Sequence, residues 1–207
     1  KPMDSLPPFD TAHLPNMTDD TGILPHAIFS VPNSLEGYTT DDNARALIVT
    51  TLLDASAFTN SHEHEALSSR YLAFLWLAFH KKTGRFRNFL SYHREWQEEI
   101  GSEDSHGRSL WALGTVLCHS DDAGLRGAAG RLFEVAVTAS LTFSSPRAWA
   151  FSILGMHAYL ECFPADRVIQ GARNVLANRL LDIYERAHSA TWDWFEKSLA
   201  YSNARLS

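Results

Sequence analysis

Beyond residue 40 the chain carries apolar residues at the spacing of amphipathic helices. In the first such run Ala44, Leu47, Ile48, Leu52 and Ala55 recur on one face, which predicts a helix over about 42–57. The same spacing predicts further helices over 62–80, 103–119, 121–142, 146–162 and 165–188. A chain of 207 residues with this periodicity favours an all-α fold in a single domain.

Two segments depart from the helical period. Residues 1–40 hold six of the eight prolines, which predicts an extended arm or a set of loops rather than a helix, because proline interrupts helices. Residues 84–97 alternate apolar and polar side chains around Phe86, Leu90 and Tyr92, which predicts a short β-hairpin or an ordered loop. We therefore divide the single domain, residues 1–207, into an arm (1–40) and a helical part (41–207).

Alternate helices share a polar start that carries an arginine and continues with small and apolar residues. The starts read DDNARAL at 41–47, DSHGRSLWA at 104–112 and SPRAWA at 145–150, and a fourth, YSNARL, lies at 201–206. The helices between them lack this start and carry more surface charge, as an outer layer would. The pattern predicts helical hairpins, each with one inner and one outer helix.

The composition argues against two classes of protein. The net charge of −6, without a basic stripe, argues against a nucleic-acid surface. The longest apolar stretches, such as residues 71–79, are too short to span a bilayer.

Cys118 and Cys162 are too few for a disulfide scaffold and lie in apolar helical runs, which favours small buried thiols. Since no secretory h-region opens the sequence, it fits a cytoplasmic protein or a secreted one whose signal has been removed.

The inner-helix starts also resemble those of a known superfamily. GYTTDDNARAL at 37–47 and GSEDSHGR at 101–108 resemble a bacterial domain that is attached to glycosyltransferases or encoded near mannan- and glucan-degrading genes. That domain is similar to the six-hairpin glycosidases, the (α/α)6 toroids. The resemblance covers the chain from about His13 to Leu206. Because only about three hairpins are complete, it implies a truncated, half (α/α)6 barrel, as in a half-barrel cellulase.

Hydrolysis of a glycosidic bond needs two carboxyl groups, one as acid and one as base or nucleophile. The candidate catalytic residues are Asp41 and Asp42 at one inner start, and Glu103 and Asp104 at the next. A helix dipole lowers the pKa of a carboxyl group at the helix start, so we expect the base at Asp41 or Asp42 and the acid at Glu103. The alternative is that these acids only cap their helices.

Candidate substrate-binding residues combine charge with aromatic surface, as sugar sites do. Arginines at the inner starts could clamp sugar hydroxyls, or they could form ion pairs with neighbouring helices. The aromatic segment 192–201 could be a sugar subsite or an apolar plug. The set is Tyr38, Arg45, His106, Arg108, Arg147, Trp192, Trp194, Glu196 and Tyr201.

No motif for a cofactor is present, and we expect neither a cofactor nor a metal. The sequence lacks a phosphate-binding loop, a nucleophile elbow and the His-Glu-x-x-His pattern of zinc proteases. His13, Asp19, Asp20 and His26 could gather a metal in the arm, but isolated His and Asp residues are unspecific.

These features together predict an enzyme that acts on carbohydrate. The resemblance implies a glycoside hydrolase, cellulase- or endoglucanase-like, that cleaves β-linked glucan or mannan with inversion. The alternatives are a non-catalytic carbohydrate-binding or accessory domain and an interaction domain whose arm swaps between subunits. Three hairpins would leave the sides of the outermost inner helices open, so we also expect an obligate homodimer that covers them. The apolar residues on these sides are Leu47, Ile48, Leu52, Leu53, Trp149, Phe151, Ile153 and Leu154.

Overall fold

The computed structural model describes residues 10–53, 55–58 and 61–206. Of these residues, 61% are helical and 9% lie in β-structure, which confirms the predicted, mostly helical fold. No helix in this part of the chain is both long enough and apolar enough to cross a membrane.

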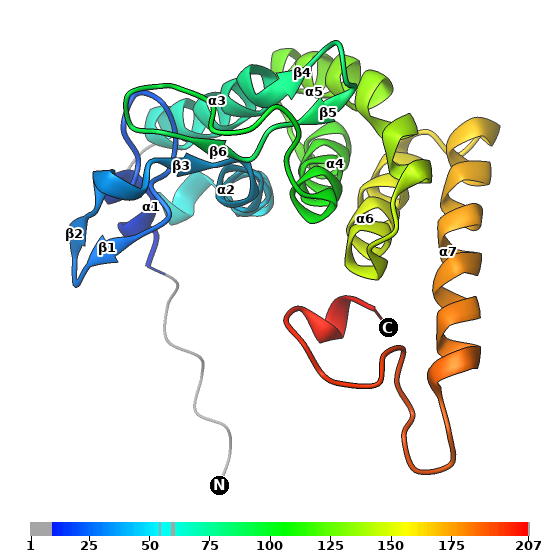
Figure 1. Cartoon of the computed structure of the whole chain (residues 1–207). Helices are drawn as coiled ribbons and strands as arrows, with labels where there is room; N and C mark the ends of the chain where they lie inside the picture. Colours follow the sequence, from blue (N-terminus) through cyan, green and yellow to red (C-terminus); the bar gives the residue numbers. More distant parts are fainter. Residues whose placement is uncertain (1–9, 54, 59–60, 207) are drawn as a thin grey trace, which may run out of the picture.

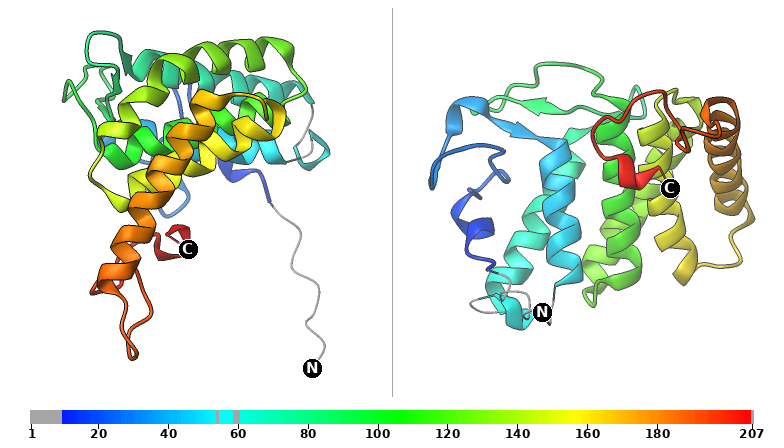
Figure 2. Two further views of the ribbon diagram at one scale, coloured as in Figure 1. Left: turned by 90° about the vertical axis from the view of Figure 1, so that its right-hand side faces the viewer. Right: turned by 90° about the horizontal axis from the view of Figure 1, so that it is seen from below.

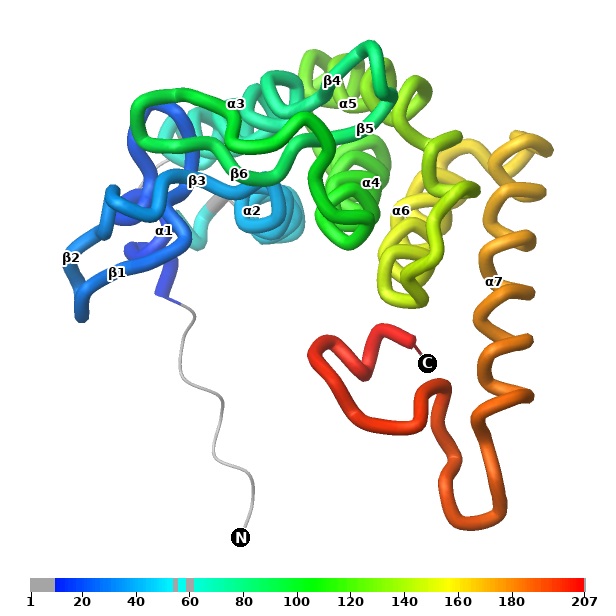
Figure 3. Tube along the Cα trace, in the orientation of Figure 1, coloured from blue at the N-terminus to red at the C-terminus, as the bar shows by residue number. Residues whose placement is uncertain are grey.

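The longer helices form two curved layers (Figures 1 and 2). The inner layer consists of α2 (Thr40–Leu52), α4 (Glu103–His119) and α6 (Pro146–Cys162). The outer layer consists of α3 (Ser61–Ala78), α5 (Ala123–Ala136) and α7 (Arg167–Ala187). Each inner helix contacts the outer helix that follows it, and α4 also contacts both α2 and α6. The C-terminal segment turns back from α7 toward the inner layer (Figure 3).

The three inner helices begin in the same way. The hydroxyl oxygens of Thr39, Ser102 and Ser145 each accept a hydrogen bond from the backbone N–H three residues further on, at 3.0, 3.1 and 3.3 Å. Each hydroxyl satisfies one of the N–H groups that a helix start leaves free, which is worth about 1 kcal/mol. These caps bring the candidate acids, which follow them within three residues, into the first helical turn.

Helices α4 and α6 approach each other closely where both carry glycine. A Cβ atom at Gly155 would lie 2.3 Å from the backbone oxygen of Leu110, and one at Gly114 would lie 2.1 Å from that of Gly155. These atoms belong to helix backbone, which cannot yield as a flexible side chain can. The close packing of α4 on α6 therefore requires glycine at both positions.

Gly155→Ala is expected to lower the free energy of unfolding by about 2–3 kcal/mol, because the added methyl group forces the two helices apart. Gly171→Ala is the matched control, since open space surrounds Gly171 within α7. Alanine there should raise the free energy of unfolding by about 0.5–1 kcal/mol through its higher helix propensity. Urea unfolding measures both changes, and equal effects would contradict the prediction.

Residues 10–39 fold against the chain's own helices. They contain α1 (His13–Asn16), β1 (Ala27–Ile28), β2 (Val31–Pro32), the 3₁₀ helix η1 (Ser34–Glu36) and β3 (Tyr38–Thr39). Thr18 shares a 2.8 Å hydrogen bond with the hydroxyl of Tyr71 on α3, and the Ile23 N–H donates to Asn43 of α2 at 3.1 Å. Of the two predicted alternatives, the extended arm is wrong for these residues, because turns between the prolines bury side chains such as Met17. A set of loops with short helices and strands describes the segment instead. Residues 1–9 of that arm lie outside the described residues.

The β-structure extends beyond the predicted 84–97 and pairs differently. β1 pairs with β2, β4 (Phe79–His80) with β5 (Arg85–Phe86), and β3 with β6 (Phe89–Leu90), all antiparallel. The helix that was predicted to reach residue 80 ends at Ala78, because a turn with Gly84 at a φ of 68° folds β5 back onto β4. The prediction that β-structure is confined to 84–97 is therefore wrong.

Two helices are shorter than the periodicity predicts. α2 ends at Leu52 and is followed by the 3₁₀ helix η2 (Ala55–Ala57). α5 ends at Ala136, and the chain continues as the 3₁₀ helix η3 (Val137–Thr142). There Ser140 Oγ donates to the carbonyl three residues back at 2.6 Å, which suits the tighter turn. The fourth predicted start forms the short 3₁₀ helix η4 (Asn203–Arg205).

Cys118 and Cys162 form a disulfide between α4 and α6. Their Cα atoms lie 5.6 Å apart although the residues are separated by 44 positions. The prediction of two buried thiols is wrong, because both cysteines lie at the C-terminal ends of adjacent inner helices and Cys162 is exposed.

The apolar sides that were predicted to need a partner are largely covered within one chain. Leu47, Ile48, Trp149 and Phe151 are buried, whereas Leu52 is exposed; Leu53, Ile153 and Leu154 are half-buried. Residues 10–39 pack against α2, and α7 packs against α6. The expectation of an obligate dimer assumed that these apolar side chains are open to water in a single chain, and this assumption is wrong for most of them.

Candidate functional site

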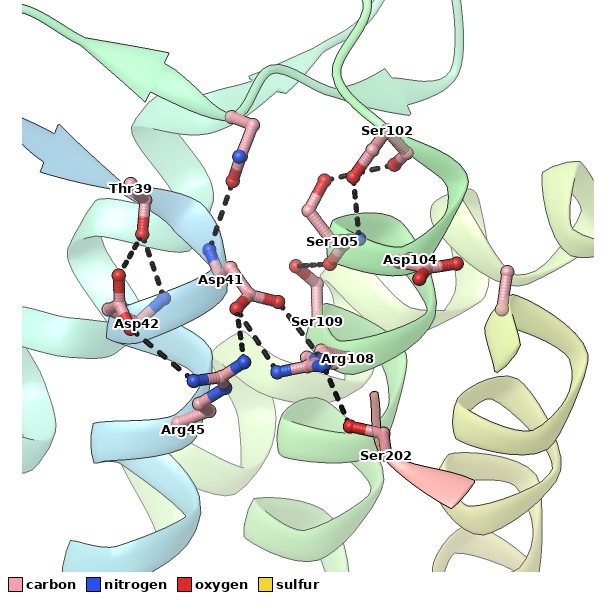
Figure 4. Close-up of polar contacts among 12 residues, drawn as sticks. Thr39, Asp41, Asp42, Arg45, Ser102, Asp104, Ser105, Arg108, Ser109 and Ser202 are labelled. Carbon is pink, nitrogen blue, oxygen red and sulfur yellow. Dashed lines mark hydrogen bonds and ion pairs between the residues drawn. The ribbon is translucent and has the colours of Figure 1, made fainter. Parts of the chain in front are cut away.

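Asp41 lies in the first turn of α2 between two arginines (Figure 4). Its Oδ2 lies 2.8 Å from Arg45 Nη2 and accepts a hydrogen bond from Arg108 Nη1 at 3.1 Å. Its Oδ1 lies 3.1 Å from Arg108 Nε. Arg45 belongs to α2 itself, whereas Arg108 reaches across from α4. The side chains of Arg108 and Asp41 are 6% and 21% exposed, so this pair is largely withdrawn from water.

Opposing influences act on the Asp41 carboxyl group. Burial raises its pKa to about 6, and the charges of Asp42 and Asp104 act in the same direction. The Arg45 guanidinium lowers the pKa, and the contact with Arg108 also favours the ionised form. At neutral pH Asp41 is therefore a carboxylate held by two guanidinium groups. The lowered pKa expected from the helix dipole is wrong for Asp41, because burial outweighs the dipole.

Asp104 lies in the first turn of the neighbouring helix α4. It accepts a 2.6 Å hydrogen bond from the hydroxyl of Ser145, the cap of α6, and forms no ion pair within the described residues. Burial raises its pKa, and the Glu103 charge adds to this, against the Ser145 hydrogen bond and the Arg147 charge. The charge of Asp104 contributes to the raised pKa of Asp41, and one carboxyl group from each predicted pair lies in the same region between α2 and α4 (Figure 4).

The other two candidate acids support the helix starts. Glu103 Oε2 accepts hydrogen bonds from the backbone N–H groups of Ser144 and Ser145 at 2.8 and 2.7 Å, at the N-terminus of α6. Asp42 Oδ2 accepts from the hydroxyl of Thr39 at 2.5 Å. These contacts match the alternative of helix capping, and they leave Glu103 less suited than Asp104 to donate a proton to a substrate.

Arg147 anchors the C-terminal segment over the inner layer. Nη1 and Nη2 donate to the two carboxylate oxygens of Glu196 at 3.0 and 2.7 Å, and Nε donates to the carbonyl of Tyr201 at 2.5 Å. The Tyr201 ring lies 5.0 Å from the Arg147 guanidinium and 5.9 Å from that of Arg108. Ser202 Oγ accepts from Arg108 at 3.4 Å. Glu196 is thus held by Arg147, and the Tyr201 ring lies next to both Arg147 and Arg108, the arginine that contacts Asp41.

His106 and Tyr38 are buried and have structural partners. Nδ1 of His106 accepts from the Phe86 N–H at 3.4 Å, and Nε2 lies 3.0 Å from the Ala136 carbonyl oxygen. Full burial lowers the pKa of His106 to about 3, so the ring is neutral. Tyr38 donates a short hydrogen bond to Asp19, and burial raises its pKa. Neither side chain is exposed enough to contact a substrate.

Trp192 and Trp194 shape the C-terminal segment. Trp192 Nε1 donates to the Glu196 carbonyl at 2.6 Å, which closes the turn that presents Glu196 to Arg147. The Trp194 ring stands edge-on to Phe195 at 5.6 Å, and its buried Nε1 has no hydrogen-bond partner among the described residues. The packing of Trp194 against the core resembles an apolar plug, and a sugar subsite at Trp192 and Trp194 stays a prediction.

The four candidate metal ligands of the N-terminal segment are used elsewhere or exposed. Asp19 accepts from the Thr21 N–H at 2.8 Å and from Tyr38. Asp20 forms an exposed ion pair with Arg94 at 2.9 Å, and both histidines are exposed. In the part of the chain that is described, these four residues form no metal-binding group.

Sequence reasoning missed two contributors to the site. Ser145 contacts Asp104, and the ring of Phe151 lies 4.4 Å from the Arg108 guanidinium. The hydroxyl residue that precedes each inner helix was a signal for Ser145, because Thr39 and Ser102 stand before the other two starts. No local pattern identifies Phe151, which reaches Arg108 through the packing of α6 on α4.

A large cavity lies at the opposite end of the inner helices. Its volume is about 800 Å³, and residues from the C-terminal ends of α2 and α4 and from the start of α3 line it, among them Thr50, His64 and His119. The candidate acids do not line this cavity.

Comparisons of the chain with protein-family models, with curated proteins and with solved structures gave no match.

Proposed function

We propose that the protein is a glycoside hydrolase that cleaves β-linked glucan or mannan, and that Asp41 and Asp104 are its two catalytic carboxyl groups. The observation that carries this proposal is the pair itself: two partly buried carboxyl groups, from the starts of adjacent helices, both with raised pKa values, and with the charge of Asp104 contributing to the raised pKa of Asp41. Perturbed carboxyl pairs of this kind are typical of acid–base sites. The proposal includes a half (α/α)6 barrel as the architecture, which the curved double layer supports (Figure 1).

The environments of the two carboxyl groups suit different roles. Burial raises the pKa of Asp104, and no ion pair among the described residues holds it ionised, so we assign to it the role of protonating the glycosidic oxygen. Asp41 is kept ionised by Arg45 and Arg108, so it removes a proton from the attacking water. Water attack opposite the leaving group gives inversion at the anomeric carbon.

The residues around the pair offer the contacts that a sugar ring needs. Tyr201 is half-exposed beside Arg108 and Arg147, and an aromatic face packs on the apolar face of a pyranose. The guanidinium groups and the Ser202 hydroxyl supply hydrogen-bonding groups next to it. These four side chains support an oligosaccharide, rather than an apolar ligand, as the substrate.

A non-catalytic carbohydrate-binding or accessory domain is the second candidate. It is favoured by the fact that Asp41, Glu103 and Glu196 all have partners within the chain. In that case the same charges hold the helix starts and the C-terminal segment together, and the site binds glycan without turnover.

Release of reducing ends from soluble β-glucan and β-mannan separates these candidates. The proposal expects release by the wild-type protein and none by the Asp41→Asn/Asp104→Asn double variant. Glycan binding in affinity electrophoresis without release by the wild type would instead support the accessory domain. Anomeric analysis of the first product by NMR tests inversion.

We also propose a homodimer, formed through the β1–β2 hairpin. Ile28, Phe29, Val31 and Leu35 are exposed there, Phe29 completely, and an apolar cluster of this kind is a common contact between subunits. Sedimentation at micromolar concentration should give twice the chain mass of 23.2 kDa, and Phe29→Asp should give a single chain. A wild-type protein that sediments as one chain would rule the dimer out.

A further inference from the structure

The C-terminal ends of α4 and α6 bring together metal-binding side chains that the proposed hydrolysis does not use. Cys118 and His119 end α4, and Glu161 and Cys162 end α6. The ligand atoms of Cys118, His119 and Glu161 all lie within 4.8 Å of one another. Cys162 is joined to Cys118 by the disulfide. Two sulfurs, an imidazole and a carboxylate therefore meet at one point, contributed by two adjacent helices.

The helix arrangement makes this end of the inner layer favourable for a cation. The starts of α4 and α6 are joined through Glu103 and Ser145, and their ends are joined through the two cysteines, so the helices run parallel. Both negative dipole ends consequently meet at the cysteines. Beside the cluster, His157 Nε2 lies 3.8 Å from Glu161 Oε1. Asp121 and Arg126 line the surface next to the two cysteines, and Arg126 donates to the Ser120 carbonyl at 2.6 Å.

The spacing is close to that of a tetrahedral metal site. With Zn–N and Zn–O bonds of about 2.0–2.1 Å and Zn–S bonds of about 2.3 Å, neighbouring ligand atoms lie about 3.3–3.8 Å apart. His119 Nε2 and Glu161 Oε2 are already 3.7 Å apart. Their side chains are 44% and 48% exposed, so they can adjust by rotation. The two sulfurs must separate, which requires cleavage of the disulfide.

We propose that Cys118, His119, Glu161 and Cys162 form a zinc-type site in the reduced protein, and that the disulfide is the metal-free alternative of this site. A thiol reductant supplies two electrons and two protons: the S–S bond breaks, both cysteines become thiols, and the reductant is oxidised to its own disulfide. Binding of a divalent metal then releases one proton from each thiol. Thiolate and imidazole ligands select zinc over magnesium or calcium. His157 lies next to Glu161, with Nε2 3.8 Å from Oε1, close enough to become an outer partner of that carboxylate in the metal-bound site.

Titration of the full chain with Zn²⁺ alone tests this proposal, with the protein either oxidised or reduced by a phosphine and desalted anaerobically. The reduced protein should bind one Zn²⁺ per chain at least 100-fold more tightly than the oxidised protein. Co²⁺ in place of Zn²⁺ should give thiolate-to-cobalt charge-transfer absorption in the reduced protein only. The comparison of two redox states needs no substitution, so it holds even if a cysteine variant folds poorly.

Variants then identify the ligands. His119→Ala should weaken Zn²⁺ binding by the reduced protein at least tenfold. His93→Ala, which removes an exposed histidine remote from the cluster, should leave binding unchanged. Equal Zn²⁺ affinity in the two redox states, or Co²⁺ binding without a thiolate band, would overturn the site.

Discussion

Asp104→Asn is expected to lower the kcat of glycan hydrolysis about 10²- to 10⁴-fold, the range for loss of a general acid. Asparagine has the same shape and can still accept the hydrogen bond from Ser145, but it has no proton to give to the leaving oxygen. Because Asp104 has no ion pair within the described residues, its replacement leaves no buried charge without a partner. The free energy of unfolding should therefore change by less than about 1 kcal/mol.

Glu103→Gln is the matched control for this prediction, since the two acids are adjacent on the same helical turn. Glu103 accepts from two backbone N–H groups at the start of α6. Loss of its charge should lower the free energy of unfolding by about 1 kcal/mol, while kcat should stay within about twofold of the wild type. Steady-state kinetics and urea unfolding of both variants separate the two roles. If Glu103→Gln abolished turnover and Asp104→Asn did not, the assignment of the acid would be reversed.

The layered helical fold could be predicted from the sequence because it depends on local periodicity. Apolar spacing places α4 at 103–119 and α6 at 146–162 without error, and the polar starts separate inner from outer helices. Boundaries failed where a nonlocal contact ended a helix. The end of α3 at Ala78 depends on the pairing of β4 with β5, and the compact N-terminal segment depends on contacts with Asn43 and Tyr71.

The residues of the candidate site could be named from the sequence, but their division of roles could not. The expectation that the base is Asp41 or Asp42 and the acid Glu103 rested on the helix dipole and not on the partners of each carboxyl group. In the structure Glu103 is engaged by the start of α6, a helix 43 residues further along the chain, and Asp104 by its capping serine. The disulfide and the proximity of His119 and Glu161 to it likewise depend on the parallel packing of α4 and α6, which no local pattern reveals.

Asp41→Asn is expected to have a larger structural effect than Asp104→Asn, because it leaves Arg108 charged and buried without an anion. Removal of one partner of such a pair costs about 3 kcal/mol or more. Arg108→Met should cost less, about 1–2 kcal/mol, because Asp41 is more exposed and keeps Arg45 at 2.8 Å. The Asp41→Asn/Arg108→Met double variant removes both charges, and its free energy of unfolding should return to within about 1 kcal/mol of the wild type.

Kinetics of the same variants distinguish catalysis from stability. The double variant regains its fold but lacks the base, so its kcat should remain about 10²- to 10⁴-fold below that of the wild type. Asp41 acts as base only when ionised, so wild-type activity should fall about tenfold per pH unit below a pH of about 6, where Asp41 becomes protonated. In Arg108→Met the carboxylate loses one stabilising cation, its pKa rises, and this acidic limb of the pH profile should move to higher pH. An acidic limb that stays in place, or a double variant that hydrolyses glycan at the wild-type rate, would show that Asp41 is part of the scaffold and not of the reaction.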